Sequence, residues 1–309
     1  MSVDHLPSRL RAVRTGEAQR TVGAEVLVSG VGLHSGARCT ARITPADIDA
    51  GVAFVASGER IPLRPAAVVD TRRCTTVGER EARVATVEHL LAALHGILID
   101  NALIYVEGPE LPALDGSSRE WVVALEAAGI VEQDGEALGV TPVATFAVVN
   151  GRSCLAVEPS DRLRLTCVIH YEHPLLGTQA GTFAISPSSF ARELAGARTY
   201  GFYAEVAALV ERGLALGGNL ENALVIFEDH YSGELRYADE CLRHKALDLL
   251  GDLYTGGRRF LGNVSAFMPG HSLNNDLIRL LHGLAPRQSD AEQDPKAGAS
   301  EALAASNKR

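Results

Sequence analysis

The sequence predicts an α+β protein with two similar halves, and three observations favour this fold class. Its 309 residues are enough for about two domains, each with its own core. In both halves, short runs of alternating hydrophobicity, which predict strands, are interspersed with segments of helical periodicity. The segments that begin at His89 and His244 read HLLAALHG and HKALDLLG, which match at the histidine, a leucine and the final glycine. Three matches in eight are a weak signal alone, but they suggest a duplicated unit.

The first half is expected to span residues 21–131, after a flexible polar extension at residues 1–20. A glycine-rich segment at 30–36 is followed by another strand-like run and not by a helix. It therefore predicts a hairpin connection, with His34 at its tip, and not a dinucleotide fingerprint. Strands are expected at 24–28, 39–43, 51–55, 66–69 and 102–106, and helices at 84–96 and 120–128.

The second half is expected to span residues 140–284, after an acidic, glycine-containing linker at 132–139. Strands are expected at 145–149, 153–157, 163–170, 223–227 and 262–267, and helices at 188–195, 204–213, around His244 and at 274–284. Residues 285–309 are rich in Gln, Ser, Asp, Lys and Ala, which predicts a disordered tail.

Composition excludes several classes of protein. A net charge of -9, without a basic run carrying aromatics, argues against a nucleic-acid binder. The five cysteines are scattered and never in CxxC spacing, which favours a reducing compartment. The N-terminus lacks the apolar core of a secretory signal, and no apolar run approaches the ~18–20 residues of a spanning helix. The sequence therefore predicts a cytoplasmic protein.

The candidate chemistry centres on the helix that contains His244 and Asp248. These residues are four apart, so both side chains point to one face and offer two ligands to a zinc ion. Alone, such a pair is more often a surface hydrogen bond. His89 on the matching helix would complete a site of two histidines and one carboxylate, and Glu88 could then take a proton from the catalytic water.

Other polar residues could complete this site. Lys245 and Asp252 lie beside the pair on the same helix. His271 follows a proline and a glycine just before a predicted helix, where a protonated imidazole could stabilise an oxyanion and protonate a leaving amine. Taken singly, each of these histidines is more often a solvated or core residue.

Several short motifs in one order make the chain resemble the zinc-dependent UDP-3-O-acyl-N-acetylglucosamine deacetylases of lipid A biosynthesis. The resemblance runs from about residue 21 to residue 284. Its carriers are GVGLHSG at 30–36, TVEHL at 86–90, DN at 100–101, LDGS at 114–117, ARTYGF at 197–202, GLALGG at 213–218, the His244 helix and GHSLNN at 270–275.

The resemblance implies two α+β domains, each a sheet with two helices, with the helices between the sheets and the active site at the domain interface. It implies zinc as cofactor on His89, His244 and Asp248, with Glu88 as general base. In this family-based assignment Lys245 and His271 assist the oxyanion and the leaving group, and Asp252 orients His271.

The resemblance also implies a substrate site. Thr199 and Phe202 would line it, and Cys74 would lie near the metal as a candidate ligand for an inhibitory second ion. Tyr200 stands where the family usually has phenylalanine. An insert at about 197–218, with Val206 and Leu209, would form a hydrophobic passage for the acyl chain. From the pattern alone, this segment would be an ordinary core helix.

The expected reaction is hydrolysis of the N-acetyl group of UDP-3-O-acyl-N-acetylglucosamine to acetate and UDP-3-O-acyl-glucosamine, the committed step of lipid A biosynthesis in Gram-negative bacteria. The expected partner is this small-molecule substrate only, without nucleic acid, and the protein is expected to be a monomer. Two alternatives stay open: a zinc amidohydrolase with another N-acyl substrate, and a metal-free homologue that binds nucleotide-sugar lipids without turning them over.

Overall fold

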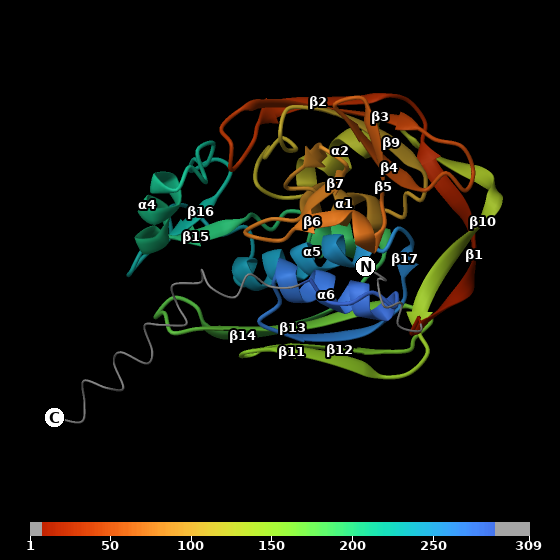
Figure 1. The fold of residues 1–309 in the computed structure, drawn as a ribbon. Helices are drawn as coiled ribbons and strands as arrows, with labels where there is room; N and C mark the ends of the chain where they lie inside the picture. Colours follow the sequence, from red (N-terminus) through yellow and green to blue (C-terminus); the bar gives the residue numbers. More distant parts are fainter. Residues whose placement is uncertain (1–7, 288–309) are drawn as a thin grey trace.

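Two five-stranded sheets enclose the helices in the computed structural model, which describes residues 8–287 (Figure 1). Sheet I has the order β2-β3-β9-β4-β5 and sheet II the order β11-β12-β18-β13-β14. The strands of sheet I are β2 (Val26–Val31), β3 (Arg38–Pro45), β9 (Ala102–Glu107), β4 (Val52–Ala56) and β5 (Glu59–Pro62). Those of sheet II are β11 (Phe146–Asn150), β12 (Ser153–Glu158), β18 (Gly262–Phe267), β13 (Leu163–Tyr171) and β14 (Gly177–Ala184).

The two sheets repeat one topology. In each, the middle strand pairs antiparallel with one neighbour and parallel with the other, and all remaining pairs are antiparallel. Each middle strand also follows a long buried helix in the chain: α1 (Glu88–Gly96) precedes β9, and α5 (Glu240–Tyr254) precedes β18. The predicted α+β fold class is therefore confirmed, and the weak repeat in the sequence has a counterpart in the strand order.

The matching glycines of the repeat allow the helices to pack closely. α1 packs against α5 between the sheets. A Cβ atom on Gly251 would lie 2.1 Å from the carbonyl oxygen of Glu88, and one on Gly96 would lie 2.2 Å from the ring of Phe190. The remaining helices of the layer are α2 (Arg119–Ala127), α3 (Pro187–Glu193) and α6 (His271–Leu281).

The predicted extension at 1–20 and linker at 132–139 are wrong where the structure describes them. β1 (Leu10–Val22) and β10 (Ile130–Pro142) form a long antiparallel pair that runs along one side of the molecule from sheet I to sheet II (Figure 1). β17 (Arg259–Phe260) pairs with β10. Their polar composition suggested loops because much of the pair faces solvent, whereas their backbone groups bond to each other.

Smaller elements surround the two sheets. Near sheet I lie the 3₁₀ turn η1 (Pro65–Ala67), β6 (Val68–Asp70), β7 (Thr76–Glu79) and β8 (Ala82–Val84). A separate group at the left of Figure 1 contains β15 (Tyr200–Phe202), α4 (Tyr203–Glu211) and β16 (Leu224–Ile226). β15 and β16 pair in parallel, so the insert expected at 197–218 continues to Ile226. The helix expected at 84–96 begins only at Glu88, because β8 ends at Val84 and Thr86 has a φ of 57°.

The predicted tail is described only at its start. The backbone N–H of Arg287 donates to Asp276 of α6, so residues 285–287 lie against that helix; residues 288–309 are outside the described part. Buried apolar side chains of both halves form one continuous cluster. Within residues 8–287, no helix is long and apolar enough to cross a membrane.

Candidate active site

Three buried side chains from α1 and α5 form a group that could hold a metal ion. The ligand atoms of His89, His244 and Asp248 all lie within 4.8 Å of one another. Asp248 Oδ1 is 3.3 Å from His244 Nε2 and 3.7 Å from His89 Nε2. Ligands about 2.0–2.2 Å from a tetrahedral zinc are separated by distances of this size. The close packing of α1 on α5 therefore brings together the residues that the sequence predicted as ligands.

The surroundings of this group fit a cation. Asp248 Oδ1 is buried without a hydrogen-bond partner among the described residues, which is costly unless an ion binds it. His244 Nδ1 donates to the carbonyl oxygen of Ala197, which leaves Nε2 as the free acceptor. Burial also lowers the pKa of His244 to about 4, so its imidazole is neutral at pH 7 and available as a ligand.

Glu88 lies in the first turn of α1, and one of its two carboxylate oxygens is fixed by a hydrogen bond. Its Oε2 accepts a hydrogen bond from the backbone N–H of Thr75 at 3.0 Å, and its Oε1 lies 3.8 Å from His271 Nε2. Burial raises the pKa of this carboxyl group above its usual value, because a charged carboxylate loses hydration there. A carboxylate with a raised pKa and one free oxygen is suited to accept a proton.

His271, the first residue of α6, is held by Asp252 of α5. Its Nδ1 donates to Asp252 Oδ2 at 2.9 Å, and its Nε2 lies 3.9 Å from Asp248 Oδ2. Burial opposes protonation, but the carboxylates of Asp252 and Glu88 outweigh it and raise the pKa of His271 to about 9. The imidazole is therefore a cation at pH 7 that presents Nε2–H to the metal group.

Lys245 provides a second cation beside the metal group. Its Nζ donates to Asp248 Oδ2 at 2.9 Å, which leaves Oδ1 for the metal. Burial opposes its charge, but Asp248 outweighs this and raises the pKa of Lys245 above its usual value. The ring of Tyr200 lies 5.8 Å from Nζ, and its centroid is 6.0 Å from that of His244.

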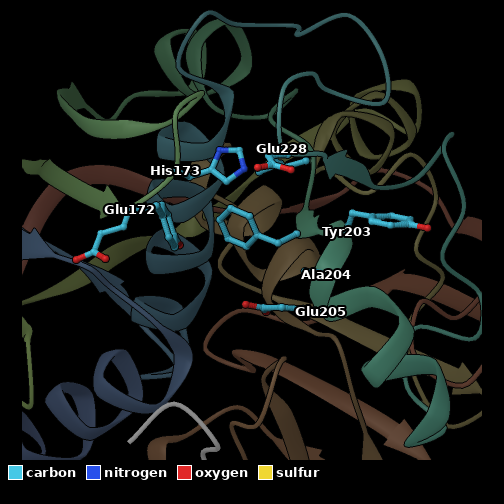
Figure 2. Close-up of a pocket in the computed structure, with 9 residues that line it drawn as sticks. Glu172, His173, Tyr203, Ala204, Glu205 and Glu228 are labelled. Atoms are coloured by element: carbon cyan, nitrogen blue, oxygen red, sulfur yellow. The ribbon is translucent and has the colours of Figure 1, made fainter. Parts of the chain in front are cut away.

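A cavity of about 540 Å³ opens near Tyr200 and is lined by aromatic side chains. Tyr171 and Phe202 line it, and the hydroxyl of Tyr171 is 2.9 Å from that of Tyr200, whose ring lies beside His244. Figure 2 shows Glu172 and His173 on one side and Tyr203, Ala204 and Glu205, from the start of α4, on the other.

Comparison with known proteins identifies the family. The sequence profile described as UDP-3-O-acyl N-acetylglycosamine deacetylase matches residues 19–283. The chain belongs to this family. It is 40% identical over 270 residues to proteins named UDP-3-O-acyl-N-acetylglucosamine deacetylase from Brucella melitensis biotype 2 and Brucella ovis, covering 85% of this chain and 94% of each relative. The resemblance stated from the motifs is thereby confirmed.

Of the side chains that were predicted to bind substrate in this deacetylase family member, only some line the cavity. Phe202 lines it, whereas Tyr200, Val206 and Leu209 do not. Tyr200 instead forms the wall toward the metal group, and Val206 and Leu209 are half-buried on α4. Thr199 follows the Ala197 carbonyl that holds His244, and its own backbone N–H donates to Gly116 at 2.7 Å.

Cys74 is close to Glu88 but outside the metal group of the described residues. Its side chain is buried, and burial raises the pKa of the thiol to about 12. A protonated thiol is a poor ligand, so a second ion there would first have to displace a proton. The inhibitory role expected for Cys74 stays a prediction.

Two residues near the site of this deacetylase family member received no role from the sequence. Thr75 donates its backbone N–H to Glu88 and its hydroxyl to Asp252 Oδ1 at 2.5 Å, so it connects Glu88 to the carboxylate that holds His271. Nothing in its local sequence marks this role. His34 lies close enough to His89 and His271 to interact electrostatically with both; its place in the glycine-rich segment was the only available signal.

Proposed function

We propose that this protein hydrolyses the N-acetyl group of UDP-3-O-acyl-N-acetylglucosamine, giving acetate and UDP-3-O-acyl-glucosamine in lipid A biosynthesis. This is the activity for which the family and the relatives are named. The observation that carries it is the buried group of His89, His244 and Asp248, with an unpartnered carboxylate oxygen and with Glu88 and His271 beside it.

The three ligands are proposed to hold zinc. A zinc ion there would act as a Lewis acid on the acetamide carbonyl and acidify the attacking water. Glu88 takes the proton of this water on its free oxygen, while Thr75 fixes the other oxygen. His271, kept protonated by Asp252, then donates Nε2–H to the glucosamine nitrogen as the amide bond breaks.

Lys245 and Thr199 are proposed to stabilise the oxyanion. The Lys245 ammonium reaches the edge of the metal group through Asp248 Oδ2, so its positive charge lies where negative charge develops. Thr199 lies two residues after Ala197, whose carbonyl oxygen accepts a hydrogen bond from His244, and this nearness to the metal group supports its role. Both roles depend on charge that forms only during the reaction, so both should affect kcat more than KM.

The insert of residues 197–226 is proposed to bind the acyl chain, with Phe202, Tyr200, Val206 and Leu209 as contacts. An ordinary core helix would bury its apolar stripe, whereas Tyr203 and Val210 of α4 are 61% and 48% exposed. Because each buried methylene contributes about 0.8 kcal/mol, a long chain could supply much of the binding free energy.

Mass spectrometry of UDP-3-O-acyl-N-acetylglucosamine after incubation with the purified protein tests this function. We expect conversion to the free amine and acetate with the wild type, and conversion about 10²–10⁴-fold slower with Glu88→Gln at equal zinc content. Conversion of a different N-acyl compound only would indicate another amidohydrolase, and binding without acetate release would indicate a non-catalytic homologue.

Cytoplasmic location and a monomeric state, both predicted from the sequence, remain part of the proposal. Light scattering coupled to size exclusion checks the second: a mass near 32.8 kDa is expected, and a multiple of it would contradict the monomer.

A further inference from the structure

Two glycine-rich segments that lie far apart in the sequence meet backbone to backbone. The N–H groups of Leu216 and Gly217, in the insert, donate to the carbonyl oxygens of His34 and Leu33 at 3.2 and 3.1 Å. A Cβ atom on Gly217 would lie 2.1 Å from the carbonyl oxygen of Gly32. Glycine is needed at 217 for this close approach and not for a left-handed backbone conformation.

Glu110 holds the segment of residues 32–36 in place through hydrogen bonds. Its carboxylate is buried, and Oε1 accepts from the backbone N–H and the hydroxyl of Ser35 at 2.7 and 2.6 Å and from the N–H of His34 at 3.1 Å. Its Oε2 accepts from the hydroxyl of Thr86 at 2.7 Å, two residues before Glu88. One carboxylate therefore ties the segment at 32–36 to the start of α1.

The insert also touches the first half near Thr199. A Cβ on Gly116 would lie 1.8 Å from the carbonyl oxygen of Asn222, and the side chain of Asn222 donates to the carbonyl oxygen of Gly217 at 2.9 Å. In sequence the insert belongs to the second half of the protein. In space it contacts the first half at residues 32–34 and at Gly116. In Figure 1 the insert, with α4, β15 and β16, lies at the left of the view, beside the helices.

We propose that docking of Leu216 and Gly217 onto the 32–34 segment, anchored by Glu110, positions the insert for binding of the substrate's acyl chain. This inference rests on the proposed function and deepens it, because it makes acyl-chain binding depend on a contact between the two halves of the molecule. Gly217 and Glu110 are positioning residues, because neither touches a reacting atom. Gly217 permits the close backbone contact between the insert and residues 32–34, and Glu110 holds the backbone of residues 34 and 35 in place.

Gly217→Ala tests the docking, with Gly233→Ala as its matched control, since a Cβ on Gly233 meets no atom within 4 Å. Loss of the two backbone hydrogen bonds is expected to raise KM for the 3-O-acylated substrate about tenfold. We expect kcat and zinc content to stay near wild type, and KM for a substrate without the acyl group to stay unchanged. Gly233→Ala should match the wild type with both substrates.

Hydrogen exchange followed by mass spectrometry gives a readout that does not need activity. The amides of Leu216 and Gly217 should be protected in the wild type and exchange faster in Gly217→Ala, while peptides of α5 keep their protection. Should Gly217→Ala fail to fold, Ser35→Ala removes one hydroxyl bond to Glu110 and should give a smaller rise in KM with the same substrate selectivity.

Equal rises in KM for both substrates, or lost protection with an unchanged KM, would overturn the inference. Failure of the proposed function is distinguishable, because the wild type would then release no acetate while the exchange experiment still reports whether the two segments dock.

Discussion

At the scale of single residues, the surroundings of Glu88 and His271, the proposed base and acid, favour opposite protonation states. Burial favours the neutral form of Glu88, whereas Asp252 favours the charged form of His271, although their nearest polar atoms are only 3.8 Å apart. Opposite environments for neighbouring groups are what a base and an acid need in order to act in one reaction.

Removal of either group should therefore slow turnover strongly without removing the metal. Glu88→Gln and His271→Gln are each expected to lower kcat by about 10²–10⁴-fold, because each takes away one proton transfer. Zinc content, measured by mass spectrometry of the metal, should stay at the wild-type value. Glu25→Gln and His170→Gln, outside the site, should keep full activity; wild-type kcat in His271→Gln would disprove its role.

The charge of Asp252 should set the basic limb of the pH profile. His271 must be protonated to donate, so activity falls as pH rises through its pKa, which burial lowers and Asp252 raises to about 9. Asp252→Asn removes the raising charge, and the basic limb of kcat/KM should therefore move to lower pH. A basic limb that stays in place would show that another group titrates there.

At this scale the sequence predicted the three residues of the buried metal group but not the residues that hold them. His244 and Asp248 were predicted from helical spacing, and His89 and Glu88 from a matching helix, because helix geometry is local. Thr75 and the Ala197 carbonyl were not predicted, since their contacts join residues that only the tertiary fold brings together.

At the scale of elements, α1 carries a buried histidine that should make stability depend on pH. His95 Nδ1 donates to the carbonyl oxygen of Leu250 on α5, and Nε2 accepts from the N–H of Phe260 on β17. Both bonds need the neutral imidazole, and burial lowers its pKa to about 4. His95 thus links α1 to two elements of the second half.

His95 binds its proton at a higher pH in the unfolded chain than in the folded chain, so acid should destabilise the folded state. Between pH 6.5 and about 4 the unfolded chain protonates His95 and the folded chain does not, so its contribution is present above 6.5 and is lost as pH falls. Urea unfolding should show a loss on the order of 3 kcal/mol over this window. His95→Gln should flatten that slope and the exposed His230→Gln should not; equal slopes in all three proteins would contradict the assignment.

Element prediction succeeded where burial produced a clear period. Apart from β5 and β14, which were not expected, the strands of both sheets and the helices α2 and α5 follow hydrophobic patterns and were expected close to their observed bounds. β1 and β10 were missed because their alternation is mostly polar, and β15 because a three-residue strand leaves no period to detect, whereas β16 lies within the strand expected at 223–227.

At the scale of the whole molecule, one buried arginine connects the two halves. Arg259 of β17 binds Asp100, between α1 and β9, through Nε and Nη2 at 2.7 Å each, and also binds Glu17 of β1. Arg259→Met would leave the largely buried carboxylate of Asp100 without its cation, so we expect a loss of about 3–5 kcal/mol in the free energy of unfolding.

Arg14 offers a matched control on the same pair of strands. It pairs with Glu136 but is 80% exposed, so Arg14→Met should cost less than about 1 kcal/mol. Asp100→Asn added to Arg259→Met should recover part of the loss, because it removes the unpaired charge. Equal small losses in Arg259→Met and Arg14→Met would show that Arg259 does not hold the halves together.

The overall arrangement of sheets and helices came from the family resemblance and not from periodicity. Hydrophobic patterns indicate which face of an element is buried, but not which other element covers it. The repeat of His89 and His244 was the one pattern that pointed to a shared interface, and its glycines now have a physical reason in the packing of α1 against α5 and α3.

The buried group of His89, His244 and Asp248 is proposed to hold the zinc on which deacetylation depends. The most direct test measures metal content and acetate release on the same samples of wild type and Asp248→Ala. We expect about one zinc per wild-type chain, and a parallel loss of zinc and acetate release in the variant. Full zinc content with full activity in Asp248→Ala would contradict the account.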